Sequence, residues 1–192
     1  MSEILENPAQ KLWQNQPVEG IKMSPQAIRL RADKFERKIV RRNVREYVSS
    51  LVASAVFVYF FATTQAILFR FAYALFIAGL GWVVFQLYRK GSARSLPADM
   101  GALNSLQFFR AELERQRDVV KNIWTWYLLP LVPGFIVLTA GSVTAHPYPY
   151  GLYTAAIMDA FVAVVFFVVW RINMRAARCL QRTIDELYAA EN

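Results

Sequence analysis

The chain is poor in the residues that build metal and catalytic sites: it has one cysteine, Cys179, and one histidine, His146, in 192 residues. A single cysteine excludes an internal disulfide, and the usual zinc sites need several converging cysteine or histidine ligands. A serine or cysteine nucleophile needs a general base within hydrogen-bond reach, and one histidine beside Pro147 supplies no such cluster. We therefore expect no metal site, no cofactor and no enzymatic activity.

Acidic residues are also scarce, with 14 Asp and Glu against 22 Lys and Arg, which gives a net charge of +8. Such an excess alone suggests either nucleic acid or anionic lipid headgroups as a partner. Apolar residues, in contrast, make up 56% of the chain, a share typical of proteins surrounded by lipid. No apolar run precedes residue 47, so we expect no cleavable signal peptide, and the first membrane helix should direct insertion itself.

Four apolar segments are long enough to cross the roughly 30 Å hydrocarbon core, which needs about 20 helical residues. They are residues 47–64, 66–88, 123–142 and 152–172. Because an open strand cannot satisfy its backbone in lipid, each segment should be a helix, and the short connections near Gln65 and at VTAHPYPYG join them in pairs. The predicted fold is therefore an all-α integral membrane protein with transmembrane hairpins at 47–88 and 123–172, the third helix kinked at Pro130 and Pro133.

Basic residues are distributed unevenly along this scheme. Residues 1–46 hold ten, residues 89–122 hold seven and residues 171–192 hold four, whereas the opposite side has only Arg70, near the outer end of the second apolar segment. The positive-inside rule then predicts a multi-pass protein of the cytoplasmic (inner) membrane with both termini cytosolic. Topology and attraction to anionic lipid explain these charges, so the lipid bilayer is the expected partner and nucleic acid is not.

Three amphipathic helices should emerge on the cytosolic side. The segment 24–46 opens with Ser24 as N-cap and Pro25 at the first helical position, and it is rich in Arg and Lys. Its apolar residues Ile28, Phe35 and Ile39 recur at helical spacing. The segment 89–122 predicts a loop followed by a second amphipathic helix, and 173–192 predicts a third.

Two roles remain open for these helices. Their apolar stripes either pack on one another or lie along the headgroups, or one stripe binds a partner protein as a helix in a groove. Residues 1–23 predict a flexible cytosolic arm, in which Trp13 either anchors a partner or packs on the neighbouring helices. The candidate partner-binding residues are Trp13, Ile28, Phe35 and Ile39.

Asp159 is the one acidic residue inside a predicted span, about 10 Å from the outer end of its helix. Charges in the membrane are costly, so they usually face the bundle interior and have partners. The structural interpretation is a hydrogen-bonded or ion-paired carboxyl group, and the functional one is a proton or ion relay. Its candidate partners are the basic Arg70 and the polar residues Gln65, Ser142, Thr144 and Tyr153.

Two glycines, Gly79 and Gly81, lie inside the second apolar segment. They do not form a phosphate-binding loop, because the sequence around them has no lysine and should be helical. Small residues in membrane helices allow close approach of neighbouring helices, so we predict close packing at these glycines.

Three blocks of the sequence carry a resemblance to a known family: LWQNQPVEGIKMSPQAIRLRADKFERKIVRRNVREY at 12–47, RKGSARSLPADMG at 89–101 and FFRAELERQRD at 108–118. Together with the apolar segments they resemble a family of uncharacterised bacterial four-helix membrane proteins, over most of the chain. Some members are encoded near extracytoplasmic-function sigma factors. The resemblance implies a membrane-tethered anti-sigma or accessory role, although this chain lacks the histidine and cysteine cluster of zinc-type anti-sigma domains.

The leading hypothesis is a non-enzymatic inner-membrane protein that binds a cytosolic or membrane partner through its basic cytosolic helices, in a regulatory role. The alternative is a small proton- or ion-coupled transporter or channel component that uses Asp159. A lipid-modifying enzyme ranks lowest, because no cluster of His, Asp or Ser lies near a predicted interface. The oligomeric state stays open, with a homo-oligomer among the alternatives.

Overall fold

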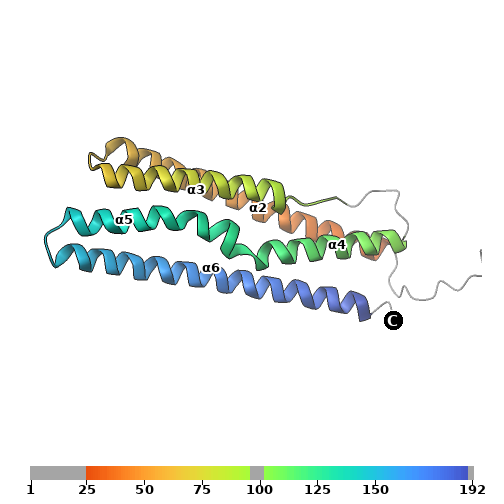
Figure 1. Cartoon of the computed structure of the whole chain (residues 1–192). Helices are drawn as coiled ribbons and strands as arrows, with labels where there is room; N and C mark the ends of the chain where they lie inside the picture. The colour runs from red at the N-terminus through yellow and green to blue at the C-terminus, as the bar shows by residue number, and fades with distance from the viewer. Residues whose placement is uncertain (1–24, 96–101, 190–192) are drawn as a thin grey trace, which may run out of the picture.

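A computed structural model describes residues 25–95 and 102–189 of the chain, and these are helical apart from short connections (Figure 1). Within the described residues, four helical stretches are long and apolar enough to cross a bilayer, which indicates a multi-pass membrane protein. The predicted all-α class and the four apolar helices are therefore confirmed. The elements are α2 (Pro25–Thr63), α3 (Ile67–Gly91), α4 (Ala102–Lys121), the π-helical turn η1 (Trp124–Leu128), the 3-10 turn η2 (Leu129–Leu131), α5 (Val132–Ala145) and α6 (Tyr150–Ala189).

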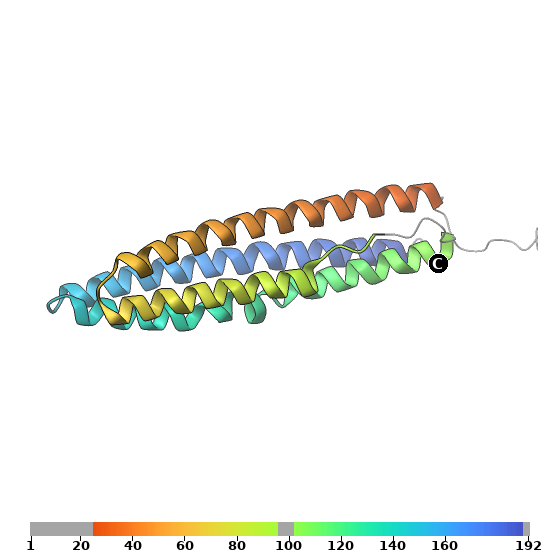
Figure 2. The ribbon, with the colours of Figure 1, turned by 90° about the horizontal axis from the view of Figure 1, so that it is seen from above.

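The long helices form two antiparallel hairpins. Residues 64–66 join α2 to α3, and residues 146–149 join α5 to α6. Both turns lie at one end of the molecule, while the start of α2 and the end of α6 lie at the other, and the α5–α6 turn extends beyond the α2–α3 turn (Figures 1 and 2). Because α2 packs on α3, α3 on α5 and α5 on α6, the middle positions belong to α3 and α5.

The predicted boundaries between cytosolic helices and spans do not coincide with helix breaks. α2 runs without interruption for 39 residues and α6 for 40, so each is about 60 Å long. No proline or glycine occurs between Gln26 and Thr63 or between Leu152 and Ala189 to end either helix. The charged segments are thus continuations of the apolar ones.

The charged ends of α2 and α6 pack with α4 into a three-helix bundle, here called the charged bundle (residues 25–46, 102–121 and 173–189). Its core is apolar and contains residues from all three helices: Ile28, Leu106, Phe109, Leu113, Ile184 and Leu187. A second core lies where this bundle meets the apolar half of the molecule, and it contains Val83, Leu87, Ile123 and Trp126.

The helix entering the third span is distorted at its prolines, as predicted. A π-helical turn and a 3-10 turn precede Val132, and Pro130 lies within the 3-10 turn. Pro130 lacks a backbone N–H and cannot take part in a regular α-helical hydrogen-bond pattern. The carbonyl oxygen of Pro130 lies so close to Gly79 of α3 that a Cβ added there would be 2.7 Å from it. A Cβ at Gly81 would meet no atom within 4 Å, so the close-packing prediction is confirmed for Gly79 and wrong for Gly81.

This contact generates a prediction with a matched control two residues away. Gly79→Ala should lower the free energy of unfolding by about 1–3 kcal/mol, because a backbone carbonyl cannot rotate away from the new methyl group. Gly81→Ala should leave stability unchanged or slightly raised, since alanine favours helix. Thermal unfolding of both variants in detergent measures the difference, and equal melting temperatures would contradict the packing described.

Candidate functional site

The apolar stripe predicted on residues 24–46 faces the interior of the charged bundle. Ile28 is fully buried and Ile39 is 4% exposed. Phe35 is partly buried and meets the ring of Phe109 on α4 edge to face, with ring centroids 6.0 Å apart. These side chains therefore pack within the chain, which is the first of the two roles left open for the stripe. A partner protein would have to contact another face of α2. Trp13 lies outside the described residues.

A separate face of α2, here called the basic face, carries five exposed cations. These residues are Lys34, Arg37, Lys38, Arg41 and Arg45. Counted from Lys34, the other four lie three, four, seven and eleven residues further along the helix, which places all five on one side of it.

Little acidic charge offsets the basic face, and exposed apolar side chains lie beside it, Leu30 and Val44 among them. Of the three acidic residues between 26 and 46, only Asp33 is exposed. Glu36 accepts a hydrogen bond from Ser95 and Glu46 accepts one from Tyr127, so both are engaged within the chain. Leu30, 56% exposed, precedes Lys34 by one helical turn. The surface therefore combines strong positive charge with an apolar contact.

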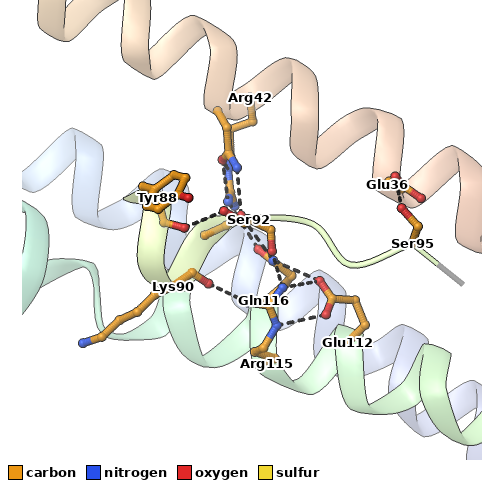
Figure 3. A network of polar contacts seen from close by, with 11 residues as sticks. Glu36, Arg42, Tyr88, Lys90, Ser92, Ser95, Glu112, Arg115 and Gln116 are labelled. Atoms are coloured by element: carbon orange, nitrogen blue, oxygen red, sulfur yellow. Dashed lines mark hydrogen bonds and ion pairs between the residues drawn. The ribbon is translucent and has the colours of Figure 1, made fainter. Parts of the chain in front are cut away.

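A buried polar network holds α2, α3 and α4 together where the charged bundle meets the apolar half (Figure 3). Asn43, Glu112 and Gln116 are each less than 7% exposed. The Arg42 guanidinium donates hydrogen bonds to the side-chain oxygens of Asn43 and Gln116, at 3.1 and 3.3 Å. Gln116 in turn donates to Glu112 at 3.1 Å. Buried polar groups of this kind are stable only when they are hydrogen-bonded to one another.

The network ends on the carbonyl groups at the C-terminus of α3. A helix leaves its last four carbonyls without partners inside the helix. Asn43 donates to the carbonyl of Gly91 at 2.8 Å. Arg115 donates to the carbonyls of Lys90 and Ser92 and is held by an ion pair with Glu112, with N and O 2.7 Å apart. A cation at this position also suits the negative end of the helix dipole.

Sequence reasoning did not find this network. Its hydrogen bonds join residues far apart in the chain, such as Asn43 and Gly91, which are 48 positions apart. The only local signal is a neutral Asn43 inside a run of basic residues.

In the apolar half, a lateral groove of about 760 Å³ lies between α5 and α6 and begins at η1. Its walls are aromatic and aliphatic, and the ring of Phe166 contacts both Trp124 and Phe135 edge to face, at centroid distances of 6.1 and 5.7 Å. Thr139 and Asp159 line the same groove. Further lining residues are Val132, Ile136, Val162, Ala163, Phe167 and Trp170.

α5 packs closely against α3. Small residues face α3: a Cβ at Gly134 would lie 2.8 Å from the ring of Phe76, and one at Gly141 would lie 3.2 Å from Phe69. Backbones approach closely where residues are small. The bulky ring of Phe135 lies between the helices on either side: it meets Phe76 of α3 at a centroid distance of 4.7 Å and Phe166 of α6 at 5.7 Å.

Asp159 occupies a position that the sequence did not predict. Its Oδ1 accepts a hydrogen bond from Thr139 of α5 at 2.6 Å, yet the residue is exposed on α6. The predictions of an interior position, and of Arg70 or one of the four polar residues as partner, are therefore wrong. Arg70 lies over the ring of Phe61, with its Cζ 5.0 Å from the ring centroid. Ser142 and Thr144 donate hydrogen bonds to carbonyls of their own helix. In the register of the α5–α6 hairpin, Thr139 is the α5 residue that reaches Asp159.

Asp159 is the one acidic residue that lines the groove, about 10 Å from the outer end of its span. A charged side chain at the centre of a span costs on the order of 2.5–3.5 kcal/mol. A hydrogen bond between membrane helices contributes only about 0.6 kcal/mol on average, so Thr139 offsets a part of that cost. Apart from Thr139, Asp159 and the indoles of two tryptophans, the groove is lined by apolar side chains. The polar chemistry of the groove is therefore concentrated at Asp159 and Thr139.

Comparison of the chain with protein-family models, curated proteins and solved structures finds no match. The resemblance described for residues 12–47, 89–101 and 108–118, and the regulatory role that it implies, stay predictions.

The cap on α3 generates a stability prediction. Asn43→Ala should lower the free energy of unfolding by about 1–3 kcal/mol, because it leaves the buried Gly91 carbonyl with a weaker set of donors. Asn104→Ala, at an exposed position of α4, is the control and should have little effect. Differential scanning calorimetry in detergent compares the two, and a neutral Asn43 variant would show that the cap is dispensable.

The Thr139–Asp159 hydrogen bond generates a second stability prediction. Thr139→Val keeps the side-chain shape but removes the donor, and should reduce stability by about 0.5–1.5 kcal/mol. Thr154→Val is the matched control, since the Thr154 hydroxyl bonds only to carbonyls of its own helix, those of Tyr150 and Gly151. Titration with a denaturing detergent measures both, and an equal effect of the two substitutions would contradict a bond between helices.

Proposed function

We propose that the protein is a non-enzymatic inner-membrane protein that holds the charged bundle at the cytosolic surface and binds an acidic protein partner through the basic face of α2. The observation that carries this proposal is the exposure of five cations on one face of a helix whose apolar stripe is already buried. These cations are exposed and do not contribute to the core of the charged bundle, so they are available to bind a negatively charged surface.

The proposed orientation rests on the charge distribution. The basic residues concentrate at the end of the molecule that carries the charged bundle, and the positive-inside rule assigns that end to the cytosol. Arg70 is the exception, close to the opposite end.

The position of the cations favours a protein partner over lipid alone. Tyr47 begins the first apolar segment, and Lys34 precedes it by 13 residues, or about 20 Å of helix. Arg37 and Lys38 lie about 14 Å from it by the same measure. Electrostatic attraction to a lipid surface fades over about 8 Å at physiological ionic strength, so headgroups attract Arg45 and Arg41 far more than the cations beyond them.

The basic face also stands on a rigid support. α2 continues without a break into the apolar half, and the network around Asn43 ties it to α3 and α4. A preorganised surface loses little conformational freedom on binding. Leu30 supplies an apolar contact at its edge. A partner held at the membrane in this way fits a regulatory role.

The alternative of a proton or ion relay has less support. The Asp159 side chain is exposed on the lateral surface that faces lipid. Besides the tryptophan indoles, the groove around it has one further polar side chain, that of Thr139. A conduction path needs a succession of polar groups.

Charge reversal on the basic face tests the proposal. Lys34→Glu, Arg37→Glu and Lys38→Glu together should weaken partner binding about ten-fold or more, because three attractive charges become repulsive. The readout is photocrosslinking from position 30 of the full-length protein in its native membrane, which should yield a discrete protein adduct that diminishes at high salt.

The matched control reverses three exposed cations of α6, with Arg175→Glu, Arg178→Glu and Arg182→Glu. The net charge changes equally, but exposed Asp185 and Glu186 already offset the positive charge of that helix. The control should retain the adduct. Equal loss in both variants, or adducts with lipid alone, would refute a protein-binding role for α2.

A further inference from the structure

We infer that the groove between α5 and α6 receives a second copy of this chain, whose Arg70 pairs with Asp159. This contact lies in the apolar half of the molecule and does not depend on the basic face of α2.

The first argument is charge complementarity. Arg70 is the only charged residue between 48 and 88, and Asp159 is the only Asp, Glu, Lys or Arg between 122 and 170. Both are exposed, and their recorded interactions are with the ring of Phe61 and the hydroxyl of Thr139. Neither has an ion pair within the described part of the chain. Because Asp159 lies on α6 and Arg70 on α3, each copy can offer one charge and receive the other.

The second argument is depth in the membrane. Gly141 of α5 lies beside Leu68 and Phe69 of α3, so these positions share one level of the molecule. Arg70 is one residue further along α3 and Thr139 two residues further along α5, both in the direction of the charged bundle, which is about 1.5 and 3 Å. Thr139 contacts Asp159, so Arg70 and Asp159 lie within about one helical turn of the same depth. Copies inserted in the same orientation share a common depth, and an ion pair between them requires this coincidence.

The third argument is the fit of the apolar surfaces beside the two charges. The face of α3 that carries Arg70 is exposed and apolar, with Ile67 80%, Phe71 56% and Phe85 50% exposed. From Arg70 to Phe85 this face is about 23 Å long, and the groove wall from Asp159 to Trp170 is about 17 Å long by helical rise. Both run from the charged residue toward the charged bundle and agree in length to about one helical turn, so this face of α3 lying along the groove brings its arginine to the carboxylate.

A lipid molecule fits the groove less well. An acyl chain can fill the aromatic walls but supplies no cation. A headgroup ammonium resides at the bilayer surface, whereas Asp159 is nine residues, or about 14 Å, along α6 from Tyr150. A second copy brings the positive charge at the required depth.

Cysteine crosslinking with both charges intact tests the geometry. In a Cys179→Ser background, copies carrying Ile67→Cys and copies carrying Ala156→Cys are co-expressed with tags of different size. Each position is exposed and lies three residues from its charged residue, toward the same end of the molecule. Oxidation in membranes should produce a mixed dimer. The control pairs Ile67→Cys with Phe167→Cys, which lines the same groove about 12 Å deeper along α6 than Asp159, and should not crosslink.

Association of purified protein in lipid vesicles tests the charge pair, with energy transfer between labelled copies as the readout. Arg70→Asp and Asp159→Arg should each weaken association about ten-fold or more, and the two together in one chain should restore it. Purified vesicles contain no other protein, so association there identifies the second copy as the occupant. Absence of association with the natural charges, equal crosslinking at both depths, or failure of the double substitution to restore binding would overturn the inference and leave the groove to lipid.

Discussion

The carbonyl groups at the end of α3 need hydrogen-bond donors, and α2 and α4 supply them through Asn43 and Arg115. This constraint sets the relation between the two halves of the molecule. A helix ending in a membrane-proximal region would otherwise expose unpaired carbonyls next to an apolar core. Because the donors come from two different helices, the same bonds that complete α3 also fix where the charged bundle stands. The apolar cores on either side, around Leu113 and around Leu87, are thereby kept in a single arrangement.

Sequence periodicity and length were sufficient for much of the fold. Four apolar stretches, two tight turns and the distortion at Pro130 all follow from rules that act within one segment. The same holds for the apolar stripe that contains Ile28, although its burial between α4 and α6 was one of two alternatives. The candidate sites depend on register between helices, and no local pattern contains that information. Gly79 and Gly81 show the limit: two glycines in one short motif, of which only one faces Pro130.

Asp159 illustrates the same limit in a charged residue. Its position inside a span was evident, and the cost of a charge in lipid correctly required a partner. Which partner it has depends on how far α5 and α6 slide along one another, a variable set by the connection at 146–149 and by the packing of Gly151 against the carbonyl of Val143. In the register that results, Asp159 lines the groove together with Thr139, Phe135 and Phe166, on the side open to lipid.

The unbroken course of α2 has a mechanical consequence. A helix bends sharply only at proline, at an inserted turn or where its hydrogen bonds are interrupted, and α2 contains no proline after its first residue, Pro25. Any tilt or rotation that the lipid environment or a neighbouring chain imposes on one end is therefore transmitted to the other as the motion of a stiff rod. One end of α2 carries Lys34 and Arg37, and the other end lies in the apolar half. A neighbouring chain that contacts α2 in the hydrocarbon region would therefore also displace these two cations.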